Sequence, residues 1–231
     1  MSSPIILALD TKDISEAEKW IAACLPQIQY FKIGLEFYLK HGAAGVAALQ
    51  TKFEFNLFLD LKLYDIPNTV RGAVESVAPL DPKFLTVHAS GGRRMIEAAS
   101  AALPHGSITA VTVLTSFTQA EFSALGNQRS IEEMVQLWAS QAIDSGATSI
   151  VCSPFEAKAI RAISNDVVII TPGVRVPGDS IGDQARVMTP KAAIDNGANF
   201  IVIGRSITNE SVNGVIAMQS KITQIIESLK S

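Results

Sequence analysis

The chain of 231 residues contains little cysteine, few aromatic residues and no excess of basic charge. Its two cysteines, Cys24 and Cys152, belong to no C-x-x-C pair or Cys/His cluster, so the sequence indicates neither a disulfide framework nor a zinc site. We interpret both as small buried side chains. With 19 basic and 22 acidic residues, the net charge is −3, which lacks the basic patch typical of nucleic-acid binding. We expect no nucleic-acid partner.

Long hydrophobic runs and targeting segments are also missing. The first apolar stretch, residues 5–9, is too short for a membrane span or a signal peptide, and no positively charged segment precedes it. We therefore expect a cytosolic protein without a membrane partner. Even so, 48% of the residues are hydrophobic and the mean hydropathy is +0.26. Such apolar content is typical of parallel strands that are buried on both faces.

Short apolar runs of strand-like character recur along the whole chain. They cover residues 5–9, 30–33, 56–61, 84–87, 108–114, 149–152, 167–170 and 200–203. Segments with the period of an amphipathic helix separate them, most clearly at 131–143 and 215–229. This alternation predicts an α/β protein in which each strand is followed by a helix.

Capping residues support the expected helix boundaries. The expected starts are Ser130 with Glu133, Ser153 with Glu156 and Pro154 at the first helical position, and Thr189 with Pro190; the expected stops are Gly146 and Gly197. The first two starts match the S-x-x-E capping box. A faint internal repeat relates the segments that begin at Asp144 and Asp195, and it supports a fold built from repeated strand-helix units.

Eight alternations within this length predict a closed (β/α)₈ TIM barrel that forms a single catalytic domain over residues 1–231. An open, doubly wound sheet is the alternative fold. The G-x-G-x-x-G pattern expected after its first strand is absent, which favours the barrel. No linker, low-complexity tract or charge run divides the chain.

Polar residues follow most of the predicted strands. They are Asp10, Lys32, Asp60, Lys62, His88, Thr115, Ser116, Thr171, Arg175 and Arg205. Reactive groups of such barrels gather at the carboxyl ends of the strands, so residues scattered along the sequence are expected to converge at one mouth.

The third strand is the most informative. Strict alternation points Leu57, Leu59 and Leu61 toward the helices and places Asp60 and Lys62 inside the rim, about 7 Å apart. A purely structural interpretation is a buried ion pair, with the polar residues at 65–69 only capping the next helix. The other ionisable groups at the mouth argue against this interpretation, because their desolvation has a cost that a structural rim would avoid.

A second arrangement suits a phosphate group. Gly204 and Arg205 follow a buried strand, so backbone N–H groups and the planar guanidinium are placed to hold an anion. Residues 172–184 form a loop with three glycines and two prolines, long enough to serve as a lid over this anion. The alternative for this segment is a mobile surface loop without a role.

These motifs also carry a family resemblance that spans nearly the whole chain. They are Leu9-Asp10, Phe31-Lys-Ile-Gly34, Asp60-Leu-Lys-Leu-Tyr-Asp-Ile-Pro-Asn-Thr69, Thr86-Val-His88, Val113-Leu-Thr-Ser116, Thr171-Pro-Gly-Val-Arg175 and Gly204-Arg-Ser-Ile-Thr208. The chain resembles the orotidine 5′-monophosphate decarboxylases. The D-x-K-x-x-D part is shared with related metal-dependent sugar-phosphate enzymes, but the combination is specific. Tyr64, where many members have histidine, and Asn209-Glu210 depart from the pattern at positions where we expect no chemistry.

The resemblance implies a carboxy-lyase that removes CO₂ from C6 of the orotate ring to give UMP in pyrimidine biosynthesis, without a metal or an organic cofactor. By similarity, Lys62 donates the proton to C6. Asp60 and Asp65 flank Lys62 in a network that includes Lys32, and Asp60 lies close to the substrate carboxylate. The family also implies a homodimer in which Asp65 and Thr69 act across the subunit boundary.

The remaining site residues are implied in the same way. Asp10, Lys32 and Thr69 resemble the residues that hold the ribose hydroxyls. Thr115 resembles the contact to the pyrimidine amide edge, with Ser116 as the alternative, and only one of the two is expected to face inward. Gln184, Arg205 and the backbone of Gly204 resemble the phosphate site, with Arg175 on the covering loop.

Two other functions remain open at this point. One is a metal-dependent sugar-phosphate lyase or decarboxylase on the same barrel. The other is a non-catalytic nucleotide-binding barrel that has kept the pocket. The intact Asp-Lys-Asp set argues against the second, because binding alone does not need it.

Overall fold

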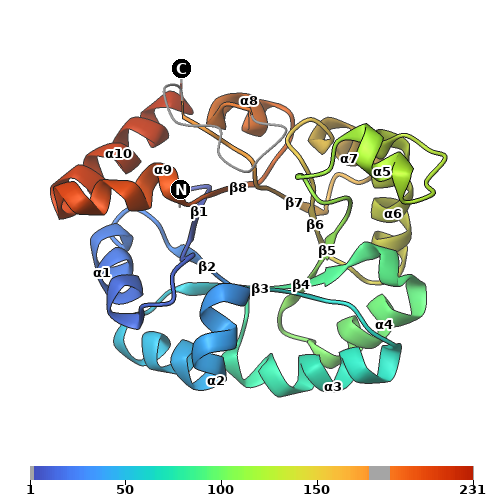
Figure 1. The fold of residues 1–231 in the computed structure, drawn as a ribbon, viewed down its shortest axis with the longest axis horizontal. Coiled ribbons are helices and arrows are strands. Elements are labelled where there is room, and N and C mark those ends of the chain that lie inside the picture. Colours follow the sequence, from blue (N-terminus) through green and yellow to red (C-terminus); the bar gives the residue numbers. More distant parts are fainter. Residues whose placement is uncertain (1–2, 177–187, 231) are drawn as a thin grey trace.

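The computed structural model describes residues 3–176 and 188–230. Eight parallel strands close into a barrel in chain order, from β1 to β8 and back to β1 (Figure 1). The strands are β1 Ile5–Ala8, β2 Tyr30–Gly34, β3 Asn56–Leu63, β4 Phe84–His88, β5 Ser107–Val111, β6 Ser149–Val151, β7 Val168–Thr171 and β8 Phe200–Ile203. The predicted barrel is confirmed, and the open sheet is wrong.

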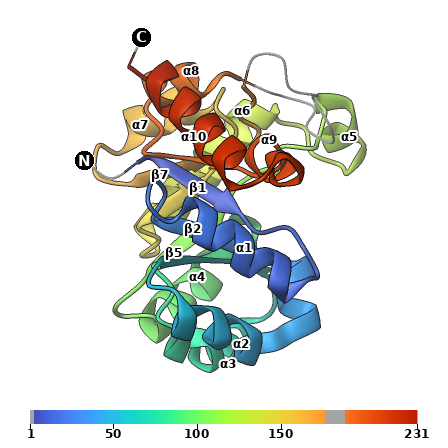
Figure 2. The ribbon, with the colours of Figure 1, turned by 90° about the vertical axis from the view of Figure 1, so that its left-hand side faces the viewer.

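The helices form a ring outside the strands (Figure 1), and the side view shows α1 and α10 in front of β1 and β2 (Figure 2). They are α1 Ile14–Cys24, α2 Leu35–Lys52, α3 Pro67–Val77, α4 Arg93–Ala102, α5 Gln119–Ala124, α6 Ile131–Asp144, α7 Ala157–Ile163, α8 Pro190–Asp195, α9 Arg205–Thr208 and α10 Val215–Ser228. Short 3₁₀ turns follow at Ala78–Leu80, Ala89–Gly91 and Asn209–Asn213. None of the described helices is long and apolar enough to cross a membrane.

Two of the predicted helix starts are confirmed. The Ser130 hydroxyl accepts the N–H of Glu133, whose carboxylate accepts the N–H of Ser130 in return, and this closed capping box starts α6. Thr189 caps α8 in front of Pro190. The predicted box at Ser153 is wrong, because α7 begins only at Ala157.

Helix α7 begins later than predicted because a turn precedes it. The N–H of Glu156 donates to the backbone carbonyl of Ser153, so these residues form a turn before the helix, and Pro154 lies in that turn. Both Ser153 and Glu156 are buried. The S-x-x-E match at Ser153 therefore lies in a turn and does not mark a helix start.

The two predicted helix stops are confirmed as well. Gly146 and Gly197 have φ values of +97° and +102°, a conformation that favours glycine, and each follows the end of a helix. They lead into β6 and β8, so the faint sequence repeat corresponds to two equivalent helix-to-strand turns.

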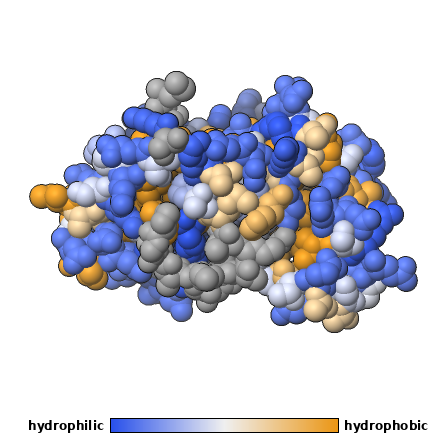
Figure 3. Space-filling view, turned by 90° about the horizontal axis from the view of Figure 1, so that it is seen from above, coloured by the Kyte–Doolittle hydropathy of each residue, from blue (hydrophilic) through white to orange (hydrophobic). Residues whose placement is uncertain are grey.

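The apolar side chains form two separate layers. Leu57, Leu59 and most other buried apolar residues pack between the barrel and the helices. A smaller cluster fills the barrel itself, with Ile6, Ala8, Phe58, Phe84, Ile170 and Val202 as its buried members. This split follows the alternation of side chains along each strand. The buried strands account for the high mean hydropathy. The face that carries α8 and α10 shows hydrophilic residues with smaller apolar patches between them (Figure 3).

Candidate active site

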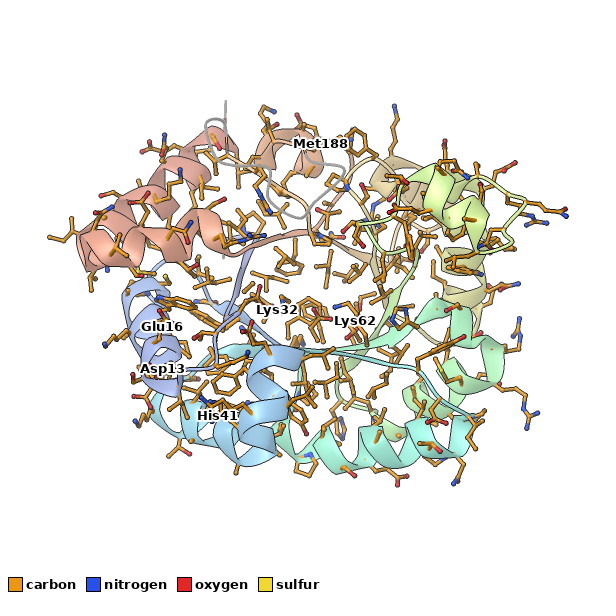
Figure 4. The ribbon with its side chains drawn as sticks, in the orientation of Figure 1. Asp13, Glu16, Lys32, His41, Lys62 and Met188 are labelled. Atoms are coloured by element: carbon orange, nitrogen blue, oxygen red, sulfur yellow. The ribbon has the colours of Figure 1, made fainter. Side chains whose placement is uncertain are left out.

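Three neighbouring strands bring four charged side chains together at the carboxyl end of the barrel. Lys32 Nζ lies 3.0 Å from Asp10 Oδ1 and 3.5 Å from Asp60 Oδ2. Lys62 Nζ donates to both carboxylate oxygens of Asp60, at 2.8 and 2.9 Å. Figure 4 shows Lys32 and Lys62 within the ring of strands, whereas Asp13, Glu16 and His41 lie out over α1 and α2. The predicted convergence of these residues is confirmed.

The four charged residues line one cavity of about 330 Å³, a size typical of small-molecule sites. Its other lining residues are Ala8, Phe58, Val111, Val113, Leu114, Thr115, Ser116, Val151, Pro172, Gly173, Arg175, Val202, Gly204 and Arg205. The charged residues thus share the cavity with apolar side chains such as Phe58, Val111, Val151 and Val202. An apolar wall lowers the local dielectric and strengthens each charge interaction.

Asp60 is the centre of the charge network and is only 8% exposed. Burial raises the pKa of its carboxyl, but the charges of Lys32 and Lys62, with hydrogen bonds from Lys62 and Thr86, outweigh burial and hold the pKa below its ordinary value. Burial lowers the pKa of Lys32, but the attraction of Asp60 and Asp10 outweighs burial. The pKa of Lys32 therefore lies above its ordinary value. Asp60 is therefore anionic and Lys32 cationic across the neutral pH range.

Strand β3 departs from the regular alternation expected for it. The pairing of β3 with β4 shifts between Leu59 and Leu63, and Lys62 has a φ of +49°. This left-handed conformation is unfavourable for lysine, and such strain concentrates at functional sites. The irregularity turns Lys62 back onto the carboxylate of Asp60, so their side chains meet directly instead of standing one strand repeat apart.

The loop after β5 differs from the expectation that only one of Thr115 and Ser116 faces inward. Both line the cavity, with Thr115 buried and Ser116 exposed. Strand β5 ends at Val111 rather than 114, so the two residues lie in a loop where strand alternation does not apply. Thr115 remains the more enclosed of the two.

The residues predicted to bind the phosphate line the same cavity. Gly204 and Arg205, at the junction of β8 and α9, and Arg175, after β7, all line it. Gly204 lies close to Ala8 and Asp10: an added Cβ would lie 3.3 Å from Cβ of Ala8 and 3.8 Å from Oδ2 of Asp10. Gln184 and most of the predicted lid lie outside the described residues.

Among residues 3–176 and 188–230, Asp65 and Thr69 do not line the cavity, and neither do His88 and Thr171, which are also expected at this mouth. Asp65 and Thr69 are exposed, and the carboxylate of Asp65 accepts the N–H of Ile66 at 2.6 Å. Helix α3 has no side-chain cap, so neither residue serves as the helix cap that the structural interpretation required.

The structure adds residues that sequence reasoning did not single out for the site. An added Cβ on Gly34 would lie 3.2 Å from Nζ of Lys32, so this glycine leaves room for the lysine. Thr86 contacts both Asp60 and Lys62. Both positions lie inside the quoted motifs, but glycine and threonine carry no charge that would mark them. His88 is half-buried, and burial together with the charge of Lys62 lowers its pKa.

A comparison with protein families agrees with this geometry. The family model described as "Orotidine 5'-phosphate decarboxylase / HUMPS family" matches residues 3–219. The chain belongs to this family. A curated relative from Thermobifida fusca, named orotidine 5'-phosphate decarboxylase, is 50% identical over 218 residues and covers 94% of each chain. A relative of the same name from Frankia casuarinae is 42% identical, covering 93% of this chain and 85% of its own.

Solved structures of the orotidine 5'-phosphate decarboxylase family share the architecture. The crystal structure of the decarboxylase from Lactobacillus acidophilus matches with a TM-score of 0.82 and 32% identity, covering 96% of this chain and 98% of that one. Within residues 3–176 and 188–230, no group of three or more His, Cys, Asp or Glu side chains forms a cluster that could hold a metal ion.

Proposed function

We propose that this chain is a carboxy-lyase that converts orotidine 5′-monophosphate to UMP in pyrimidine biosynthesis, with residues 1–231 as one cytosolic catalytic domain. The observation that carries the proposal is the position of Lys62: its ammonium group is held by both oxygens of Asp60 at the wall of a nucleotide-sized cavity. The 50% identity to a named decarboxylase supports the same reaction.

The chemistry requires a fixed positive charge. When the bond from C6 to the carboxylate breaks, its electron pair stays on C6 in the plane of the ring, where the π system cannot delocalise it. Stabilisation must therefore be electrostatic. The ammonium of Lys62 faces this charge and transfers its proton to C6 as CO₂ leaves; the neutral amine then regains a proton from solvent. Balanced in this way, the reaction needs no electron acceptor and no cofactor.

Asp60 has two functions in this proposal. Its carboxylate holds the ammonium of Lys62 in place, and it lies against the carboxylate of the substrate. Lys32, Asp60, Lys62 and Asp65 sum to zero charge, and the substrate carboxylate adds one negative charge. Loss of neutral CO₂ relieves the repulsion between that carboxylate and Asp60. The apolar wall of Phe58, Val111, Val151 and Val202 then accepts the uncharged product.

The rest of the nucleotide follows the shape of the cavity. Asp10 and Lys32 bind the ribose hydroxyls, and Thr115 contacts the amide edge of the base. Arg205, the backbone of Gly204 and Arg175 bind the phosphate, together with Gln184 from the covering loop. Binding energy from this remote phosphate contributes to catalysis by closing the site and removing water.

We further propose a homodimer with shared active sites. Asp65 and Thr69 are exposed at the barrel mouth instead of lining their own cavity. Exposed apolar side chains follow β2 and β3: Leu39 is 79% exposed after β2, and Ile66, next to Asp65, is 66% exposed after β3. A second copy that covers this surface would bury these side chains and deliver Asp65 and Thr69 to the neighbouring cavity.

An ultraviolet assay of orotidine 5′-monophosphate, run with excess EDTA, tests the reaction. The expected result is loss of substrate absorbance that the chelator does not change. Activity abolished by EDTA and restored by a divalent metal would favour the metal-dependent lyase. Tight binding of UMP without any change in orotidylate absorbance over hours would favour the non-catalytic barrel.

Mixing two inactive variants tests the shared site. Lys62→Ala and Asp65→Ala each lose activity, but a mixed dimer contains one site with both native residues. Since half of the dimers are mixed and one site in two is intact, the mixture should regain about a quarter of the wild-type activity. A mixture as inactive as its components, although subunits are shown to exchange, would contradict the shared site.

A further inference from the structure

The backbone conformation of Lys62 needs an explanation beyond its own side chain. Lys62 is one of two non-glycine residues with positive φ in the described part of the chain; the other, Asp81, lies in a turn. The ladder between β3 and β4 is interrupted from Leu59 to Leu63, so regular strand pairing does not hold Lys62. Some other contact must stabilise this unfavourable conformation.

Thr86 supplies that contact. It lies on β4, is fully buried, and points into the barrel with Phe84 and His88, two residues away on either side. Its hydroxyl oxygen accepts the backbone N–H of Lys62 at 2.8 Å, and its O–H donates to Asp60 Oδ1 at 3.0 Å. A hydroxyl has both capacities at once, so a single group joins the strained main chain to the carboxylate.

The contacts close a ring. The backbone of Lys62 bonds Thr86, Thr86 bonds Asp60 Oδ1, and the same oxygen receives Nζ of Lys62 at 2.8 Å. The backbone N–H of Lys62 is thereby held by Thr86, its ammonium group is held by Asp60, and Thr86 and Asp60 are hydrogen-bonded to each other. Thr86 does not line the cavity, so it reaches the reacting atoms only through Asp60 and Lys62.

We propose that Thr86 is a positioning residue for the decarboxylation: its hydroxyl holds the left-handed turn at Lys62 and the orientation of Asp60, and so aims the ammonium group into the cavity. This inference rests on the proposed function of Lys62. Proton transfer to a carbon atom depends steeply on distance and direction, and a small misplacement of the donor costs up to about 10²-fold in rate.

The neighbouring strand offers a matched control. Thr109 on β5 pairs in register with Thr86, faces the same side of the sheet and is equally buried. Its hydroxyl contacts Ser149 at 2.6 Å, within a group of hydroxyls that includes Ser107, away from the charged residues. Replacing either threonine by valine removes one buried hydroxyl from the barrel at constant shape, but only Thr86 contacts Asp60 and Lys62.

The experiment compares Thr86→Val, Thr86→Ser and Thr109→Val with the wild type. Turnover, UMP affinity and the folded fraction by circular dichroism are measured for each protein. Thr86→Val should lower kcat by about 10- to 100-fold with UMP affinity within about threefold, whereas Thr86→Ser, which keeps the hydroxyl, should stay within about threefold of wild-type kcat. Thr109→Val should keep kcat per folded molecule within about twofold, whatever its stability.

A pH profile separates positioning from a merely structural role. The hydrogen bond from Thr86 is one of the contacts that lower the pKa of Asp60, so its loss should move the acidic limb of kcat to higher pH in Thr86→Val but not in Thr109→Val. Three outcomes would overturn the proposal. The first two are turnover of folded Thr86→Val within twofold of wild type and an equal loss of turnover in Thr109→Val. The third is failure of both Thr86→Val and Thr86→Ala to fold, because the hydroxyl would then serve stability. Wild-type activity in the same assay separates these outcomes from failure of the proposed function.

Discussion

The two ends of the barrel differ in how they hold charged side chains. At the carboxyl end, Asp60 and Lys32 are buried charges, and Lys62 has an unfavourable backbone conformation. At the other end, the positive charge of Arg161 meets neutral acceptors: it donates to the carbonyls of Ser164, Asn165, Val167 and Gly197 and to Oδ1 of Asn199. The carboxyl end therefore holds desolvated charges and a strained backbone that a reaction can use, whereas at the amino end the charge of Arg161 is hydrogen-bonded to neutral acceptors.

Aromatic packing adds to this contrast. Tyr30, Phe84 and Phe200 are the first residues of β2, β4 and β8, and their rings lie 4.7 to 6.0 Å apart inside the barrel. They fill the amino end of the barrel below the cavity. The effects of substitutions at the two ends should therefore be separable: those at the carboxyl end should change rate or affinity, and those at the amino end should change stability.

The largest expected effect is on turnover at the carboxyl end. Lys62→Ala should bind UMP within about tenfold of wild type but lose about 10²- to 10⁴-fold in kcat, since it lacks the proton donor. Lys191→Ala is the control, because this lysine pairs with Asp195 on the exposed surface of α8. Steady-state assays of both variants measure the difference. Near-normal turnover in Lys62→Ala would remove the residue from the mechanism.

At the amino end, Arg161→Ala should reduce the free energy of unfolding by about 3 kcal/mol or more, because several partly buried acceptors lose a charged donor. Turnover per folded molecule should not change. Urea denaturation, with exposed Arg94→Ala as the control, gives the comparison. A fall in kcat at unchanged stability would break the separation between the two ends.

A smaller effect on affinity is expected at the phosphate side of the mouth. Arg205→Ala should raise KM by about 10- to 100-fold, the loss expected for a charged hydrogen bond. Added phosphite should stimulate turnover of a truncated substrate, a nucleoside that lacks the phosphate group. If KM of Arg205→Ala proves independent of the substrate phosphate, the anion site is assigned to the wrong residue.

The smallest effect concerns two serines that look alike in sequence. Ser130→Ala removes a formed capping box and should cost about 1 kcal/mol in the free energy of unfolding. Ser153→Ala should cost less, since no helix starts at that position. Thermal or urea unfolding of both variants measures the difference; an equal or larger loss in Ser153→Ala would contradict the boundary of α7.

Much of the fold and of the site follows from sequence pattern. The alternation of strands and helices predicts the closed barrel, and the charges after the strands predict the cluster of Asp10, Lys32, Asp60 and Lys62. Strand alternation cannot predict the turn at Lys62, because it assumes a regular backbone. It also cannot identify Thr86, since threonine is common in strands and its importance arises from tertiary contacts.

Hydrogen exchange at C6 of UMP most directly tests the role of Lys62, because it forms the C6 carbanion without loss of CO₂. In D₂O, NMR of UMP follows exchange of the hydrogen on C6, which requires a negative charge at that carbon opposite the amine of Lys62. We predict that the wild-type protein replaces this hydrogen by deuterium at least about 10²-fold faster than Lys62→Ala does. Equal exchange by the two proteins, with UMP bound to both, would contradict the account.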